Sequence, residues 1–241
     1  MFEGISQKTN KENVVNGLWS KEKNRDLIGR DFSQYLKNIN DPGMTEDGFL
    51  KMLQKGKVLD VACGEGGFIR DCLEKNVDIF GVDLAFADIA NVERLTNEGK
   101  LTEEMKKRIF AVDATVLPFE DDSFETIFNS SGAFSYTHTS IEVADMLHEQ
   151  IRVLSIGGKI IINPVEIHAR GFCPANFVNS FLNKESRLSE ENLIEMENIF
   201  SDEITKLLKE KKIAVELNDE CDDANKKEDG LYGTAIITKL S

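Results

Sequence analysis

Residues 58–70 have the sequence Val58-Leu59-Asp60-Val61-Ala62-Cys63-Gly64-Glu65-Gly66-Gly67-Phe68-Ile69-Arg70. A short apolar run with an acid near its end is followed by a turn rich in glycine. The next apolar residues recur at helical spacing: Phe68, Ile69, Cys72 and Leu73. This order predicts a strand, a glycine loop and a helix, which is the local structure typical of nucleotide-binding proteins.

The length and charge of the chain limit the classes of protein to which it can belong. Its 241 residues, 41% of them hydrophobic, are enough for the core of one large α/β domain. The 43 acidic residues outnumber the 29 lysines and arginines, and the formal net charge is −14. Because nucleic acids and anionic membranes attract cationic surfaces, we expect neither as a partner.

The cysteines and the N-terminal residues predict the compartment. Four cysteines form no Cys-x-x-Cys pair and are too sparse for a disulfide framework: Cys63, Cys72, Cys173 and Cys221. Residues 1–24 lack the apolar segment of a signal peptide, and no apolar run reaches the length of a membrane span. We therefore expect a cytoplasmic protein.

Apolar runs separated by turn residues predict alternating strands and helices. Strands are expected over residues 78–84, 108–113, 126–129 and 159–163, and helices over residues 26–38, 45–53, 86–97 and 142–154, with an extra helical turn within 99–108. In the tail, 164–188 is expected to be irregular, 193–200 and 204–208 to be two helices, and 213–217 and 231–240 to be two strands that pair antiparallel. The alternation predicts a parallel, doubly wound sheet, whose ligand lies outside the carboxyl ends of the strands.

Polar side chains stand at the predicted ends of the first four strands. They are Asp60, Asp83, Asp113 and Asn129. Because the carboxyl ends of parallel strands meet at one edge of a sheet, we expect these side chains to gather at that edge.

Four motifs together resemble a known family. They are VLDVACGEGG (58–67), GVDL (81–84), DATVLPFEDDSFE (113–125) and RVLSIGGKIII (152–162). In this order and spacing they resemble the class I S-adenosylmethionine-dependent methyltransferases. The resemblance implies a Rossmann-like, mostly parallel seven-stranded sheet with helices on both faces and an antiparallel C-terminal strand. It also implies S-adenosyl-L-methionine as cofactor and S-adenosyl-L-homocysteine as product.

The resemblance implies roles for the residues around the glycine loop. Gly64 and Gly66 lack a Cβ, so the backbone can approach a ligand, and their amides would meet the methionine carboxylate near the helix N-terminus. Asp60 occupies the position of the acid that helps to hold the methionine end of the cofactor. Ala62 stands where the family frequently has glycine, and its methyl group is expected to be tolerated.

The later strand ends would hold the nucleoside. Asp83 would accept hydrogen bonds from both ribose hydroxyls, and Leu84 would offer an apolar face to adenine. Asp113 would accept from the adenine amino group, and the Ala114 amide would donate to a ring nitrogen. Asn129 completes the cofactor site that the resemblance implies.

The acids and the glycine loop also allow two less favoured interpretations. An acid at a strand end often serves only as a helix cap or turn residue, but three acids at successive strand ends favour a ligand. A dinucleotide-binding fingerprint would place a third small residue where this chain has Ile69, and it would not explain residues 113–119. A nicotinamide oxidoreductase is therefore the less favoured enzyme.

The acceptor side of the site is expected on the loop 129–138. Tyr136 and His138 are weak candidates for a catalytic role, because a loop position alone favours ordinary loop residues. His148 is expected on the surface, and His168 either lines the acceptor pocket or lies on a solvated loop. Three histidines with no pair at ligand spacing predict that there is no metal site.

The resemblance predicts a methyltransferase that moves a methyl group to a small-molecule acceptor by direct displacement. The alternative is a non-catalytic binding or regulatory subunit of the same fold, because the recognisable residues serve the cofactor and not the acceptor. We expect residues 1–55 to be an N-terminal arm with cap helices, and residues 56–241 to be the cofactor-binding domain with an insertion at about 164–200. The protein is expected to be a monomer or a homodimer.

Overall fold

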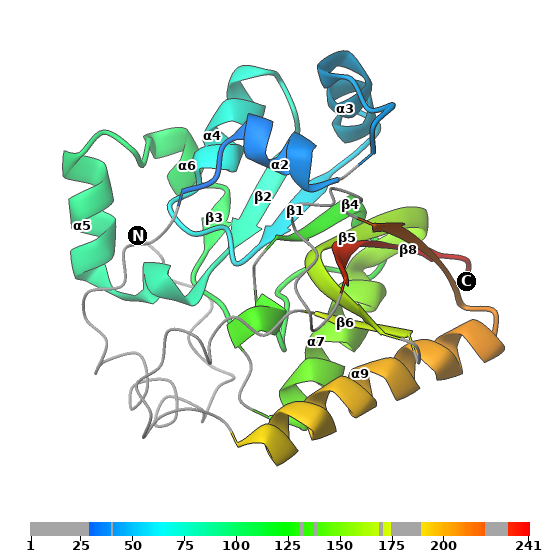
Figure 1. Cartoon of the computed structure of the whole chain (residues 1–241). Coiled ribbons are helices and arrows are strands. Elements are labelled where there is room, and N and C mark those ends of the chain that lie inside the picture. Colours follow the sequence, from blue (N-terminus) through cyan, green and yellow to red (C-terminus); the bar gives the residue numbers. More distant parts are fainter. Residues whose placement is uncertain are drawn as a thin grey trace.

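The glycine loop lies where the sequence predicts it, between strand β1 (Val58–Val61) and helix α4 (Gly67–Glu74). The computed structural model describes residues 29–39, 41–130, 133–136, 139–168, 171–174, 189–219 and 231–241. In Figure 1, helices surround a central sheet that contains β1. The predicted doubly wound α/β sheet is confirmed.

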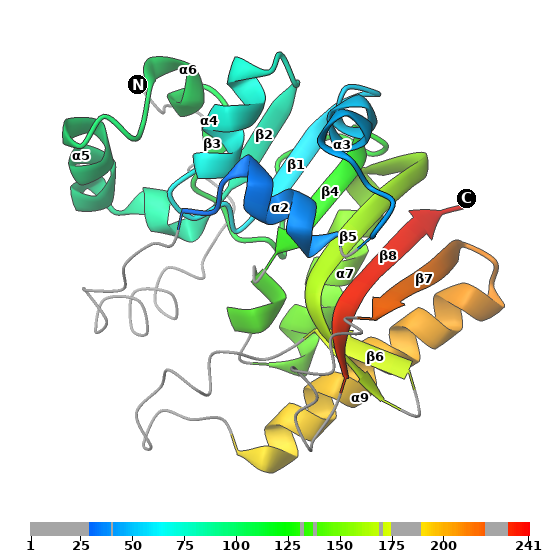
Figure 2. The same ribbon diagram turned by 45° about the horizontal axis from the view of Figure 1, so that its top comes forward.

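Seven strands lie side by side in the order β3-β2-β1-β4-β5-β8-β7, which Figure 2 shows across the sheet. Their bounds are β2 Ile79–Val82, β3 Ile109–Phe110, β4 Phe124–Ser130, β5 Leu154–His168, β7 Ile213–Asp219 and β8 Leu231–Lys239. Strand β8 pairs antiparallel with β5 and β7, and the other pairs in this order are parallel. The antiparallel C-terminal strand is therefore confirmed.

Two apolar cores cover the two faces of the sheet. On one face, α2 (Phe32–Asn38), α3 (Glu46–Leu53) and α4 pack through aromatic rings that include Phe32, Tyr35, Phe49, Phe68 and Phe128. On the other face, α7 (Ser140–Val153) and α9 (Glu190–Lys209) pack against β1, β4 and β5. Successive residues of β1 enter opposite cores, as the alternation of side chains along a strand requires.

Local capping explains where the helices begin. Thr45 accepts a hydrogen bond from the Gly48 amide at 3.1 Å and starts α3, as predicted. Thr139 and Glu142 form a reciprocal capping box that starts α7. Asp31 accepts from the Gln34 amide at 2.9 Å and starts α2 at Phe32, whereas the predicted start at residue 26 lies outside the described residues.

Two other elements are shorter or divided compared with the prediction, and a third ends one residue earlier than predicted. The helix predicted over 86–97 is split into the 3-10 helix η1 (Leu84–Ala87) and α5 (Ile89–Asn97), because Asp88 ends the first and caps the second. Strand β3 has only two residues, since the chain turns immediately after Phe110. Helix α7 ends at Val153, where Leu154 leaves the helical conformation and begins β5. The extra helical turn is present as α6 (Glu103–Lys106).

The tail is more regular than the sequence predicts. Residues 164–168 extend β5, which pairs antiparallel with β6 (Gly171–Pro174), so this part of the predicted irregular segment is a hairpin. The two predicted helices are one helix, α9. Its buried side chains continue along one stripe without a glycine or proline to interrupt it: Met196, Phe200, Ile204 and Leu207.

The N-terminal helix α2 is held against the last strands of the sheet. The Asn218 side chain on β7 donates to the Ile39 carbonyl at 3.0 Å, and the Thr234 hydroxyl on β8 donates to the Asn38 carbonyl. These contacts fix α2 across the carboxyl edge, as Figure 2 shows. The C-terminal end of α2 is therefore joined to β7 and β8.

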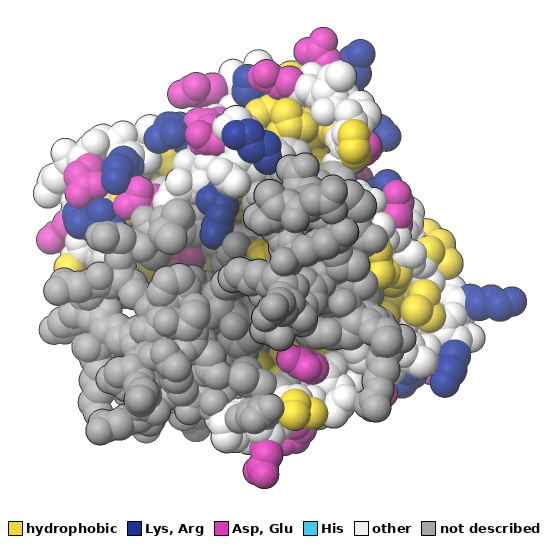
Figure 3. Space-filling view, in the orientation of Figure 1, with side chains coloured by type: hydrophobic (Ala, Val, Ile, Leu, Met, Phe, Trp, Pro, Cys, Tyr) yellow, Lys and Arg dark blue, Asp and Glu magenta, His cyan; other side chains and the backbone are white. Residues whose placement is uncertain are grey.

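The described surface carries both signs of charge. On the face seen in Figure 3, acidic and basic side chains are intermixed around α3, α4 and α5. The longest described helix, α9, has 20 residues but is rich in acids and lysines. Among the helices in the described ranges, none is long and apolar enough to cross a membrane.

Candidate functional site

Asp83 joins the end of β2 to the glycine loop. Its Oδ2 accepts a hydrogen bond from the Gly64 amide at 2.9 Å, and its Oδ1 accepts from the Ala85 amide at 2.8 Å. Burial raises the pKa of Asp83, and these two amides lower it. Asp83 is thus also a helix cap, yet each of its carboxylate oxygens keeps a second lone pair for a ligand.

The glycine loop has three residues with positive φ. They are Ala62 at 61°, Gly64 at 56° and Gly66 at 75°. Ala62 is thus a side-chain-bearing residue in the left-handed region, which favours glycine. The Gly66 amide donates to the Cys63 carbonyl at 3.0 Å, so the amides of both loop glycines are already bonded within the protein.

Asp60 is fully buried beneath α2, one residue before the end of β1. Its Oδ1 accepts from the Tyr35 hydroxyl at 2.7 Å, and its Oδ2 has no partner among the described residues. Burial raises the pKa of Asp60 to about 7, while the Tyr35 hydrogen bond and the Arg30 charge lower it. A buried carboxylate oxygen without a donor is costly, and a bound cation would satisfy it.

Asn129 provides a second unsatisfied polar atom on the neighbouring strand. It is 1% exposed, and its Nδ2 has no partner among the described residues. Asp60 pairs in register with Phe128, so the Asn129 side chain leaves the sheet on the opposite face. Asp60 and Asn129 therefore lie on adjacent strands without facing one another.

Asp113 lies in a turn three residues beyond β3. Its Oδ1 accepts from the Thr115 amide at 2.9 Å and from the Thr115 hydroxyl at 2.8 Å. Ala114 packs half-buried against the core, and Leu84 is half-buried in η1 after Asp83. These residues follow neighbouring strands at the same edge, in the arrangement that the sequence predicts.

Two residues of the N-terminal segment also lie at the carboxyl edge of the sheet, and the sequence did not predict them there. Tyr35 contacts Asp60, and Arg30 donates from Nη1 to the Ser130 carbonyl at 3.0 Å. The segment before α2 also packs closely on α4: a Cβ on Gly67 would lie 2.8 Å from the Arg30 carbonyl oxygen. Tyr35 lies within the helix predicted over residues 26–38, but nothing in the local sequence indicated that its hydroxyl meets a buried acid.

A small cavity opens where this segment meets the glycine loop. Its volume is about 190 Å³, and its lining residues are Gly29, Arg30, Asp31, Glu65, Gly67, Arg70 and Lys100. The cavity is bordered by the N-terminus of α4 and therefore lies at the end of the edge where a negatively charged group is favoured.

The candidates for the acceptor side are only partly described. His138 lies outside the described residues, and Tyr136 ends the 3-10 helix η2 (Ala133–Tyr136) with its side chain outside the described part. The His168 side chain is also outside it. His148 is half-exposed on α7, 3.3 Å from Glu203 of α9, as a surface residue should be. Within the described ranges no three acids, histidines or cysteines are grouped to hold a metal.

Comparisons with known proteins agree with this architecture. Residues 58–158 match the family model described as a methyltransferase domain. No curated protein sequence matches the chain.

Solved structures resemble the chain at low sequence identity. Phosphoethanolamine N-methyltransferase 2 of Haemonchus contortus, solved with S-adenosyl-L-methionine, is 15% identical with a TM-score of 0.52, and the match covers 98% of this chain and 61% of that one. A candidate S-adenosyl-L-methionine-dependent methyltransferase from Methanococcus maripaludis is 17% identical over 99% of this chain and 98% of that chain, with a TM-score of 0.47. A SAM-dependent methyltransferase from Methanosarcina mazei is 16% identical over 80% and 96% of the two chains, with a TM-score of 0.46.

The matched residues run from β1 through α7 to the glycines at the start of β5, and they contain the glycine loop and the acids after β2 and β3. Residues 58–158 therefore match a methyltransferase domain in sequence, and the strand order of the sheet agrees with that fold.

Proposed function

We propose that the protein transfers a methyl group from S-adenosylmethionine to a small-molecule acceptor. The observation that carries this proposal is the buried Oδ2 of Asp60 beside the glycine loop, which has no hydrogen-bond partner among the described residues. Such an atom requires a hydrogen-bond donor. The ammonium group at the methionine end of S-adenosylmethionine is a donor of opposite charge.

The residues at the carboxyl edge fit the other parts of the cofactor. Asp83 retains a free lone pair on each oxygen for the two ribose hydroxyls. Asp113 uses Oδ1 in its own turn, which leaves Oδ2 for the adenine amino group. Leu84 and Ala114 would supply apolar contacts to the adenine ring.

The bound cofactor would supply a methyl group on a positively charged sulfur, which a nucleophile displaces directly. The protein then has to align the acceptor with that methyl group and to exclude water, and alignment can contribute about 7–11 kcal/mol. The segment carrying Arg30 and Tyr35 closes one side of the edge and so helps to exclude water. Tyr136 and His138 remain predictions for the acceptor side, where a base is needed only for a protonated acceptor.

Two further observations bear on the acceptor class and on the domain division. A net charge of −14 disfavours a nucleic-acid acceptor, and this supports a small molecule. The contacts of α2 with β7 and β8 support residues 1–55 as a cap on the domain 56–241, and the insertion at about 164–200 stays a prediction.

Calorimetry with S-adenosylmethionine and S-adenosylhomocysteine tests the cofactor site. We expect the wild-type protein to bind both and Asp83→Ala to lose binding. Asp88→Ala is the matched control, because Asp88 also caps a helix, accepting from the Ala90 amide at 2.9 Å, but lies exposed. Equal heats in the wild type and Asp83→Ala would contradict the proposed site.

Incubation with methyl-labelled S-adenosylmethionine and fractions of a metabolite extract tests the acceptor. We expect label in a small-molecule product. Label that appears only in protein or nucleic acid would contradict the acceptor class. No label at all, together with recovery of a tight protein partner, would favour a regulatory subunit.

A further inference from the structure

The methionine end of S-adenosylmethionine carries a carboxylate as well as an ammonium group. The amides expected to hold that carboxylate are occupied: Gly64 donates to Asp83 at 2.9 Å, and Gly66 donates to the Cys63 carbonyl at 3.0 Å. The carboxylate therefore needs another donor at this end of the edge.

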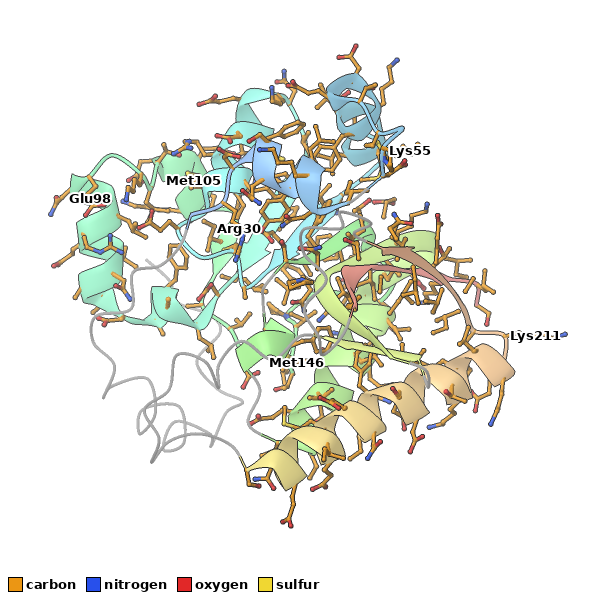
Figure 4. The ribbon with its side chains drawn as sticks, in the orientation of Figure 1. Arg30, Lys55, Glu98, Met105, Met146 and Lys211 are labelled. Carbon is orange, nitrogen blue, oxygen red and sulfur yellow. The ribbon has the colours of Figure 1, made fainter. Side chains whose placement is uncertain are left out.

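Arg30 lies at the required place. Its Nη1 donates to the carbonyl of Ser130 at the end of β4, and its charge lowers the pKa of Asp60 on the adjacent strand. Arg30 also lines the cavity beside Gly67 at the start of α4. Figure 4 shows the labelled Arg30 towards the middle of the molecule, in contrast to the peripheral Glu98 and Lys211.

Three cationic residues line the cavity, and the side chains of two of them are paired with neighbouring acids. Lys100 lies 3.0 Å from Glu65, and Arg70 lies 3.1 Å from Asp71. Arg30 has no carboxylate within ion-pair distance among the described residues. Within the same residues, its side chain donates a hydrogen bond to the neutral Ser130 carbonyl. Its positive charge is therefore available to an anion that enters the cavity.

We propose that Arg30 binds the carboxylate of the methionine end while Asp60 binds its ammonium group, so that the N-terminal segment is part of the cofactor site. A guanidinium has five donors, and one bond to Ser130 leaves enough for a bidentate contact with a carboxylate. A cation from the segment before α2 and an anion from β1 then recognise the amino acid as a zwitterion. This inference rests on the proposed function.

Calorimetry with two ligands separates the carboxylate from the rest of the cofactor. S-adenosylmethionine and decarboxylated S-adenosylmethionine share the nucleoside, the sulfonium and the amine, and only the first has the carboxylate. We expect Arg30→Met to weaken binding of S-adenosylmethionine by about 10- to 100-fold, as loss of a charged hydrogen bond does, and to leave the decarboxylated ligand within about twofold. Arg30→Lys keeps the charge without the planar fork and should lose less.

Arg70→Met is the matched control, because Arg70 lines the same cavity but is paired with Asp71. We expect it to bind both ligands as the wild type does. Unchanged affinity of Arg30→Met for S-adenosylmethionine, while Asp83→Ala loses binding, would overturn the role of Arg30 and leave the proposed function standing. Equal weakening of both ligands would also overturn it, because Arg30 would then only hold the fold. If the wild type binds neither ligand, the proposed function fails and this inference fails with it.

Discussion

Replacing Asp60 by asparagine should make the stability of the ligand-free protein less sensitive to a rise in pH from about 5 to about 8. Burial raises the pKa of Asp60 from 3.8 to about 7. A raised pKa means that the folded state holds a proton which the unfolded state has already released. Stability from this group is therefore complete below the unfolded pKa and is lost as the pH rises through about 7.

The size of the effect follows from the shift of about 3 pKa units. At about 1.4 kcal/mol per unit, ionising the folded carboxyl removes about 4 kcal/mol of stability once the pH exceeds both pKa values. Between about pH 5 and about pH 8, the loss should be about 3 kcal/mol. Asparagine keeps an acceptor for the Tyr35 hydroxyl but does not ionise, so any cost of its buried amide is the same at every pH.

Urea unfolding of wild type and Asp60→Asn across this pH range measures the difference directly. We expect the wild type to lose stability relative to the variant as the pH rises. Tyr35→Phe provides a second check, because it removes a hydrogen bond that lowers the Asp60 pKa and should shift the loss to higher pH. A difference between wild type and Asp60→Asn that stays constant from about pH 5 to about pH 8 would refute the reasoning.

Three further substitutions test other parts of the structure. Ala62→Gly should raise the free energy of unfolding by about 1 kcal/mol in thermal or urea unfolding, because φ is 61° at this position, and a loss of stability would contradict this. Gly67→Ala would place a Cβ 2.8 Å from the Arg30 carbonyl, so we expect about 1–3 kcal/mol of destabilisation and weaker S-adenosylmethionine binding, measured by urea unfolding and calorimetry. Arg152→Met should cost about 2 kcal/mol, because Arg152 donates to the Leu117 carbonyl at 3.0 Å and to Glu149 at 2.7 Å; an unchanged urea midpoint would contradict this.

The local sequence predicts much of the cofactor edge. Gly64, Asp83 and Asp113 could be placed because each follows a short apolar run that forms a strand. A run of this kind is recognised from neighbouring residues alone. The structure brings them to the same edge in the predicted order.

Long-range contacts explain what the sequence could not predict. Two hydrogen bonds of the site join residues far apart in the sequence. Tyr35 and Asp60 are 25 positions apart, and Arg30 and Ser130 are 100 positions apart, so the local spacing of residue types could not predict either bond. The extension of β5 beyond residue 163 likewise depends on partners in β6 and β8. Helix α9 is continuous because the core buries its whole apolar stripe. The polar residues between 200 and 204 led to the prediction of two separate helices.

The docking of α2 on the last strands has a consequence for the order in which the protein is made. Helix α2 is synthesised early, yet Asn38 and Ile39 are held by Thr234 and Asn218, which lie 196 and 179 residues later. Domains fold as their segments leave the ribosome, and contacts of such separation must wait for the second partner. During synthesis, these two contacts can therefore form only after β7 and β8 emerge, and until then α2 is held by contacts such as its packing on α4 and β4.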